Sequence, residues 1–217
     1  MSNEQSKRLD EILNKQDNVF NMWMEYWKDF STWETWQFWA ILLMLVIPLI
    51  IVVFAIDKRH AFHIGFFGFN IHSWTTYSDA ISVRSGFATY PYQAIPIMPV
   101  NFALDASLIP VSFMLLYQWS LKHNKNFFLY GVILCAIYSF LFKPLLVSLD
   151  LLQLHKGMNY FYIFLNYLLI LLLSIAVTKF FKYLKNKAGV ESLNWLSIFI
   201  YFKLRKFKEY FSLKLIT

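Results

Sequence analysis

The feature that most constrains this chain is an apolar run at residues 36–56 that contains no charged side chain. About 20 apolar residues are needed for a helix to cross the roughly 30 Å of hydrocarbon in a bilayer. Lipid offers no partner to a free backbone N–H or C=O group, so a spanning run of this length is expected to be helical. The run therefore predicts a membrane protein.

Four further segments have the length and apolar character of spans, and they cover residues 61–83, 103–121, 127–149 and 160–181. The composition agrees, because 15% of the residues are charged, against about 25% in an average soluble domain. We predict an all-α integral membrane bundle of about five transmembrane helices at residues 36–181. An aromatic amphipathic N-terminal segment (1–35) and a basic amphipathic C-terminal tail (182–217) flank it.

The charges of the flanking segments predict an orientation in the cell (cytoplasmic) membrane. Thirteen Lys and Arg residues lie in the C-terminal tail and in the loops on its side, whereas six lie on the opposite side. Basic residues are enriched on the cytoplasmic side of membrane proteins. We therefore expect the N-terminus outside and the C-terminus in the cytoplasm. The N-terminal segment lacks the basic start and the small-residue cleavage site of a signal peptide.

The N-terminal segment is rich in aromatic residues, which fall partly at helical spacing. Indole rings favour the boundary between headgroups and water, so Trp23, Trp27, Trp36 and Trp39 are predicted membrane anchors. The alternative is an aromatic platform for a ligand. The full set is Phe20, Trp23, Tyr26, Trp27, Phe30, Trp33, Trp36, Phe38 and Trp39.

The C-terminal tail combines an apolar stripe with a basic cluster. Lys203, Arg205, Lys206 and Lys208 accompany apolar residues that recur every three or four positions. This pattern is typical of a helix on an anionic leaflet, so anionic inner-leaflet lipids are the expected partner and nucleic acid is not. The apolar stripe consists of Leu193, Leu196, Ile200, Leu204, Phe207 and Phe211.

Three ionisable residues inside the predicted spans form the candidate site, because a charge is costly in hydrocarbon and marks function by default. Asp79, Asp105 and Lys143 should all lie in the outer part of the bundle. Arg84 and Asn101 belong to the loop above them, and Tyr77 and Tyr138 lie at a similar depth. These seven residues predict an outward-facing polar pocket.

Lys143 and Asp105 each allow more than one interpretation. Lys143 is expected to form a structural ion pair with Asp105 or Asp79, to hold a ligand or ion, or to snorkel to the interface. Pro144 follows it and should loosen the helix by removing a hydrogen-bond donor. Asp105, which follows a proline-rich apolar stretch, is expected to cap a helix start, to contact a ligand, or both.

The sequence lacks the motifs of several kinds of functional site. The lone Cys135 excludes an internal disulfide and a cysteine-based metal site, and no phosphate-binding glycine motif occurs. His60 and His63 lack a third metal ligand at suitable spacing. We expect no cofactor and no metal. The favoured function is non-enzymatic binding of a small molecule, a lipid headgroup or a partner helix of another membrane protein. A small transporter or channel is the alternative, and a lipid-acting membrane enzyme is a third.

Several strings resemble a functionally uncharacterised family of small multi-pass membrane proteins of endospore-forming Gram-positive bacteria. The resemblance covers residues 27–181 and implies a four- or five-helix bundle in the cytoplasmic membrane. It implies no particular activity. The family would have a glutamate where this chain has His63. The strings are Asp57-Lys58-Arg59, Phe67-Gly68, Tyr90-Pro91 with Pro96 and Pro99, the run from Asp105 to Val111, Met114-Leu115-Leu116-Tyr117-Gln118, and Asn159-Tyr160.

Overall fold

A computed structural model describes residues 1–96 and 100–187 of the chain. The described part is mostly helical, which confirms the predicted all-α character. The chain divides into two compact units, residues 1–176 and 177–217. The predicted basic stripe of the C-terminal tail, with Lys203, Arg205, Lys206 and Lys208, lies outside the described residues.

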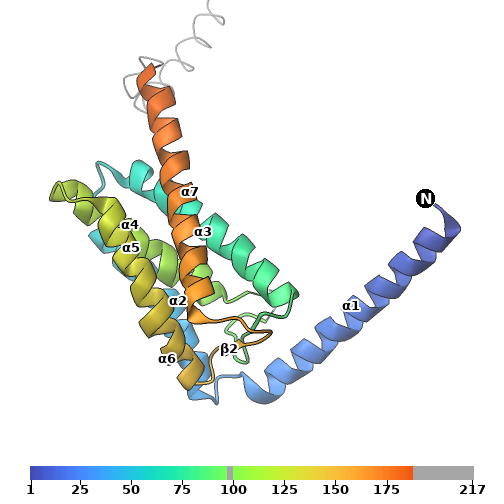
Figure 1. Cartoon of the computed structure of the whole chain (residues 1–217). Helices are drawn as coiled ribbons and strands as arrows, with labels where there is room; N and C mark the ends of the chain where they lie inside the picture. The colour runs from blue at the N-terminus through green and yellow to red at the C-terminus, as the bar shows by residue number, and fades with distance from the viewer. Residues whose placement is uncertain (97–99, 188–217) are drawn as a thin grey trace, which may run out of the picture. The chain divides into compact units, whose positions relative to one another are not determined.

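Helices follow one another along the chain, interrupted by one pair of very short strands (Figure 1). The elements are α1 (Asn3–Phe30), α2 (Trp36–Ala55), α3 (Ala61–Arg84), β1 (Ala88–Thr89), η1 (Leu104–Leu108), α4 (Ile109–Lys122), α5 (Phe127–Ile137), η2 (Tyr138–Phe142), α6 (Lys143–Ser148), β2 (Gln153–Leu154) and α7 (Tyr160–Lys187). The segments η1 and η2 are π-helical turns that continue directly into α4 and α6.

Three helical stretches of the described part are long and apolar enough to cross a membrane: Trp36–Ala55, Phe127–Ser148 and Tyr160–Lys185. They correspond to the first, fourth and fifth predicted spans. The other two predicted spans are also helical, as α3 and as η1 with α4. These two are not long and apolar enough to count among the candidate spans. The surface of α2 fits lipid, because it buries only Ile41 and Pro48 and leaves Phe54 85% exposed.

Each π-helical turn ends shortly before a proline. Pro110 follows η1 by two residues, and Pro144 follows η2 by two residues. Proline has no N–H group for the helical hydrogen bond, and a widened turn is one way to continue a helix past it. The loosening predicted next to Pro144 therefore takes the form of η2. Asp105 lies in η1 and Lys143 directly follows η2, so both buried charges lie at these irregular turns.

Glycine allows two close helix contacts in the core. A Cβ atom at Gly68 of α3 would overlap the Met114 side chain of α4. At Gly131 of α5 it would lie 2.9 Å from the Leu171 side chain of α7. Small residues let helix backbones approach closely, which is a main source of helix association in membranes.

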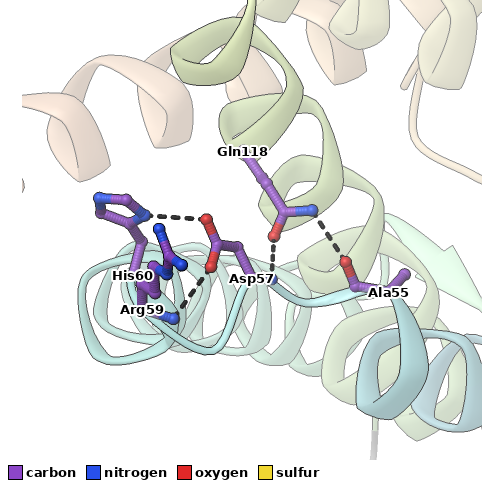
Figure 2. A network of polar contacts seen from close by, with 5 residues as sticks. All are labelled: Ala55, Asp57, Arg59, His60 and Gln118. Atoms are coloured by element: carbon purple, nitrogen blue, oxygen red, sulfur yellow. Dashed lines mark hydrogen bonds and ion pairs between the residues drawn. The ribbon is translucent and has the colours of Figure 1, made fainter.

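The α2–α3 connection is fastened to α4 by a network of polar contacts (Figure 2). Gln118 of α4 donates from Nε2 to the Ala55 carbonyl at 2.9 Å and accepts from the Asp57 N–H at 2.7 Å. The Asp57 carboxylate accepts from the Arg59 N–H and pairs with His60, both at 2.9 Å. These contacts, His60 first, hold the pKa of Asp57 below its ordinary value. The segment from Asp57 to His60 and the end of α4 thus meet at one end of α3 and α4.

Replacement of Gln118 by alanine should destabilise the fold. Both backbone groups that the Gln118 amide satisfies would lose a partner, and we expect a loss of about 1–2 kcal/mol in unfolding free energy. Thermal unfolding of the purified protein in detergent measures it. Gln153→Ala is the matched control, because Gln153 is exposed and pairs through its backbone. Equal stability of the two variants would contradict the role assigned to Gln118.

Candidate functional site

Asp79, Asp105 and Lys143 line one pocket of about 280 Å³. They come from three separate segments, since Asp79 lies near the end of α3, Asp105 in η1 and Lys143 at the start of α6. The predicted juxtaposition of these three side chains is therefore present. The pocket is completed by Thr75, Ser78, Ile81, Ser82, Phe87, Ala88, Tyr90, Leu152, Leu154, Met158, Tyr162, Ile163, Asn166, Tyr167 and Ile170.

Two loops are joined beside the pocket by the antiparallel strands β1 and β2. Ala88 pairs with Leu154 and Thr89 with Gln153, and the His155 N–H donates to the Phe87 carbonyl at 2.9 Å. Ala88 and Leu154 both line the pocket. The pairing therefore fixes the segment that leads to Tyr90 against the segment that leads to α7.

A hydrogen-bond chain runs through the buried side chains. The Lys143 ammonium donates to the Tyr90 hydroxyl at 3.3 Å, and that hydroxyl donates to Oδ1 of Asp79 at 2.7 Å. The Asn101 N–H donates to Oδ2 of Asp79 at 3.2 Å. Lys143 also lies over the Tyr90 ring, 5.5 Å from its centre. One tyrosine thus connects the ammonium of one helix to a carboxylate of another.

Tyr90 serves as a donor because it keeps its proton. Its side chain is almost completely buried. The residue directly follows β1, in the loop outside the predicted spans. Burial raises the pKa of Tyr90 well above its ordinary value, and the neighbouring charge of Asp79 raises it further. A neutral phenol can donate to the Asp79 carboxylate and accept from Lys143 at the same time.

Asp105 is the least satisfied member of the group. Its side chain is 5% exposed, and its Oδ2 atom is buried without a hydrogen-bond partner. Its backbone carbonyl pairs with the ring of His72 at 2.8 Å. Its carboxyl group lies within hydrogen-bonding reach of the Asp79 carboxyl group, and Lys143 is its other charged neighbour. A buried polar atom with no partner is costly, so this oxygen calls for an explanation.

The structure separates the three interpretations of Lys143. The side chain is 6% exposed and lines the pocket, so it does not snorkel to the lipid interface. No ion pair within 4.0 Å joins it to Asp79 or Asp105 in residues 1–96 and 100–187, so the expected direct pair is replaced by the contact through Tyr90. The ammonium remains available for a ligand.

Asp105 does not cap a helix start, in contrast to that expectation. The helix begins earlier, at Phe102, and Asp105 lies inside the first π-helical turn. Asn101 takes the capping position, because its Oδ1 atom accepts from the Leu104 N–H at 3.2 Å. Helix capping therefore does not explain why the Asp105 carboxylate is buried.

The other predicted pocket residues lie around the site and do not line it. Asn101 contacts it through its backbone N–H. Tyr138 is buried, but its hydroxyl pairs with Ser112 at 2.7 Å. Tyr77 is 65% exposed on α3, and Arg84 lines a different pocket.

Sequence reasoning missed three contributors. Tyr90 was visible only as one polar residue of a loop, and its central position depends on the strand pairing. Ser78 donates to Oδ1 of Asn166 at 2.8 Å and so bridges α3 and α7 at the pocket. An asparagine within the apolar run 160–181 was the available signal for this bridge, since buried amides in spans tend to pair between helices.

A second pocket of about 690 Å³ lies between α1 on one side and the end of α3 with the segment that follows it on the other. Its α1 side includes Phe20, Trp23, Tyr26 and Trp27, and the Trp27 indole donates to the Gln93 carbonyl at 2.8 Å. Arg84 and Lys15 also line it, and Lys15 pairs with Glu11. The residues that line this larger pocket are mainly apolar. The buried charges Asp105 and Lys143 line the smaller pocket instead.

No protein-family model, no curated protein and no solved structure matches the chain. In the described residues, no group of three or more His, Cys, Asp or Glu side chains is arranged to hold a metal ion. The family resemblance and the function therefore remain predictions from the chain's own residues.

Replacement of Tyr90 by phenylalanine should destabilise the protein strongly. The change leaves the ring but removes the acceptor of Lys143 and the donor to Asp79, and hydrogen bonds to charged groups contribute about 1.5–3 kcal/mol each. We expect a loss of at least about 2 kcal/mol in thermal or denaturant unfolding. Tyr77→Phe on the exposed side of α3 is the control. A Tyr90→Phe protein as stable as this control would contradict the hydrogen-bond chain.

Proposed function

We propose that this chain is a multi-pass protein of the cytoplasmic membrane whose outward-facing pocket binds a small polar molecule or a lipid headgroup without transforming it. In this proposal five helices cross the bilayer, with the N-terminus outside and the C-terminus in the cytoplasm. The observation that carries it is the convergence of Asp79, Asp105 and Lys143 from three separate helical segments around one open pocket.

The energetics favour binding over a purely architectural role. Burying an ion costs several kcal/mol even after relaxation, and a pair repays this only when its geometry is excellent and its remaining polar atoms are satisfied. Within residues 1–96 and 100–187 the ammonium makes one side-chain hydrogen bond, at 3.3 Å, and Oδ2 of Asp105 receives none. Charges kept at such a cost in an open pocket are typical of binding sites.

The distribution of charges favours binding over transport. Asp79, Asp105 and Lys143 all lie at the end of the helices where β1 pairs with β2. The network of Gln118 and Asp57 occupies the other end of α3 and α4. A transport path is expected to place its site near the middle of the bilayer, between related halves of the protein.

The strand pairing supports the five-span arrangement. It holds residues 85–90 beside residues 153–155, so both loops belong on one side of the membrane. The second of these loops lies between two stretches that are apolar enough to span, Phe127–Ser148 and Tyr160–Lys185. The helices α3 and α4 would then cross as well, with their more polar faces turned toward the bundle.

Cysteine labelling in cells tests this arrangement. In a Cys135→Ala background, Ser85→Cys and His155→Cys should react with a membrane-impermeant maleimide from outside, because their loops face out. Lys125→Cys should react only after the membrane is opened. All three native positions are exposed, so accessibility reports the side of the membrane. Labelling of Ser85→Cys and His155→Cys from opposite sides would contradict the arrangement.

A pocket-filling substitution tests binding. Ser82 lines the pocket, so Ser82→Phe should occupy its space without removing a charge. Native mass spectrometry of the purified protein should show a retained small molecule or lipid on the wild type and its loss, by about tenfold or more, from Ser82→Phe. Ser73→Phe, on α3 but outside the pocket, should retain it. Equal retention by all three proteins would contradict the proposal.

A further inference from the structure

We infer that the group received by the 280 Å³ pocket is a primary ammonium, bound at the free oxygen of Asp105. The inference rests on the proposed function and specifies the chemistry of its ligand. It is carried by the charge balance of the pocket, by the unpartnered carboxylate oxygen, and by the shape of the opening.

The charge balance calls for a cation. Two carboxylates and one ammonium line the pocket, and they are the only charged side chains of the described residues that do so. Lys143 and Asp79 are already joined through the Tyr90 hydroxyl. Asp105 lies beside the Asp79 carboxyl group, and no hydrogen bond links it to Lys143 in the described residues. With both carboxyl groups ionised, the site carries one net negative charge, which a single bound cation would balance.

The hydrogen-bond inventory narrows the cation to one with N–H donors. Oδ2 of Asp105 receives no hydrogen bond from the described residues, and Tyr167 and Asn166 line the same pocket. A primary ammonium offers three donors and can satisfy several acceptors at once. A quaternary ammonium has the same charge but no donor, so it would leave this oxygen unsatisfied. An anion would meet two carboxylates and is disfavoured.

The opening of the pocket favours delivery from lipid. Ile81 and Tyr162 line the pocket, yet they are 66% and 56% exposed, so they form its mouth between α3 and α7. Apolar side chains exposed at the depth of a span face hydrocarbon. The volume of about 280 Å³ lies just below the range of about 300–1,000 Å³ for sites that hold drug-sized molecules. It suits an ethanolamine-type headgroup whose acyl chains stay in the bilayer.

Lipid nanodiscs with matched headgroups test the inference on the whole chain. The probes are phosphatidylethanolamine, which carries a primary ammonium, and phosphatidylcholine, which carries a quaternary one, each added to phosphatidylglycerol discs. Soluble ethanolamine, titrated into the detergent-purified protein, is a separate arm. We expect phosphatidylethanolamine to raise the unfolding temperature well above the value in phosphatidylcholine. Stabilisation by the lipid alone assigns the group to a headgroup, and stabilisation by ethanolamine assigns it to a soluble amine.

Asp105→Asn provides the residue-specific arm. It keeps the shape of the side chain and removes the charge, so it should weaken binding of the amine by about tenfold to a hundredfold. Asp150→Asn is the control, because Asp150 is exposed, lies outside the pocket, and has a φ of 56° that asparagine tolerates. The comparison of the two lipids on the wild type stands even if Asp105→Asn does not fold.

The outcomes separate the two proposals. Equal stabilisation by phosphatidylethanolamine and phosphatidylcholine, with no response to ethanolamine, would overturn the ammonium assignment. So would an unchanged amine affinity in Asp105→Asn. If Ser82→Phe nevertheless loses a retained molecule that the wild type carries, the pocket still binds a ligand of another class. If no retained molecule depends on the pocket and neither amine stabilises the protein, both proposals fail.

Discussion

The burial of the Lys143 ammonium among apolar helices is the constraint on which the site depends. An isolated charge in such a place would be unfavourable by several kcal/mol. The Tyr90 hydroxyl reduces this cost, because it accepts from Lys143 and passes a hydrogen bond to Asp79. That geometry needs α3, the loop after β1 and α6 in fixed positions. The charge cluster and the packing around it are therefore parts of one structure.

The helix irregularities serve the same arrangement. A regular helix places every side chain by its periodicity, and a π-helical turn changes the direction of the residues that follow. Both turns, η1 and η2, carry or adjoin a buried charge, and a proline follows each of them. Each proline thus follows a π-helical turn from which a charged side chain, Asp105 or Lys143, enters the pocket.

The sequence predicted the parts of this fold that depend on local chemistry. Long apolar runs predicted the helices. The alternating direction of the predicted spans was enough to place Asp79, Asp105 and Lys143 at one end of the helices. It could not predict the partner of Lys143, because Tyr90 reaches the site only through the pairing of β1 with β2, which joins residues about 65 positions apart. It also misassigned the cap of the helix after the proline-rich stretch, since Asn101 and Asp105 are both good capping residues and only the backbone register separates them.

The two-residue pairing of β1 with β2 has a consequence for how the interior communicates with the surface. Tyr90 directly follows β1, so a molecule that pushes its ring aside would pull on that strand. The strain would pass through the paired backbone to the loop that begins α7, where His155 and Lys156 are exposed. A buried hydroxyl and an exposed loop are thus connected through one pair of backbone strands, so a ligand that displaces Tyr90 is expected to shift the loop before α7 as well.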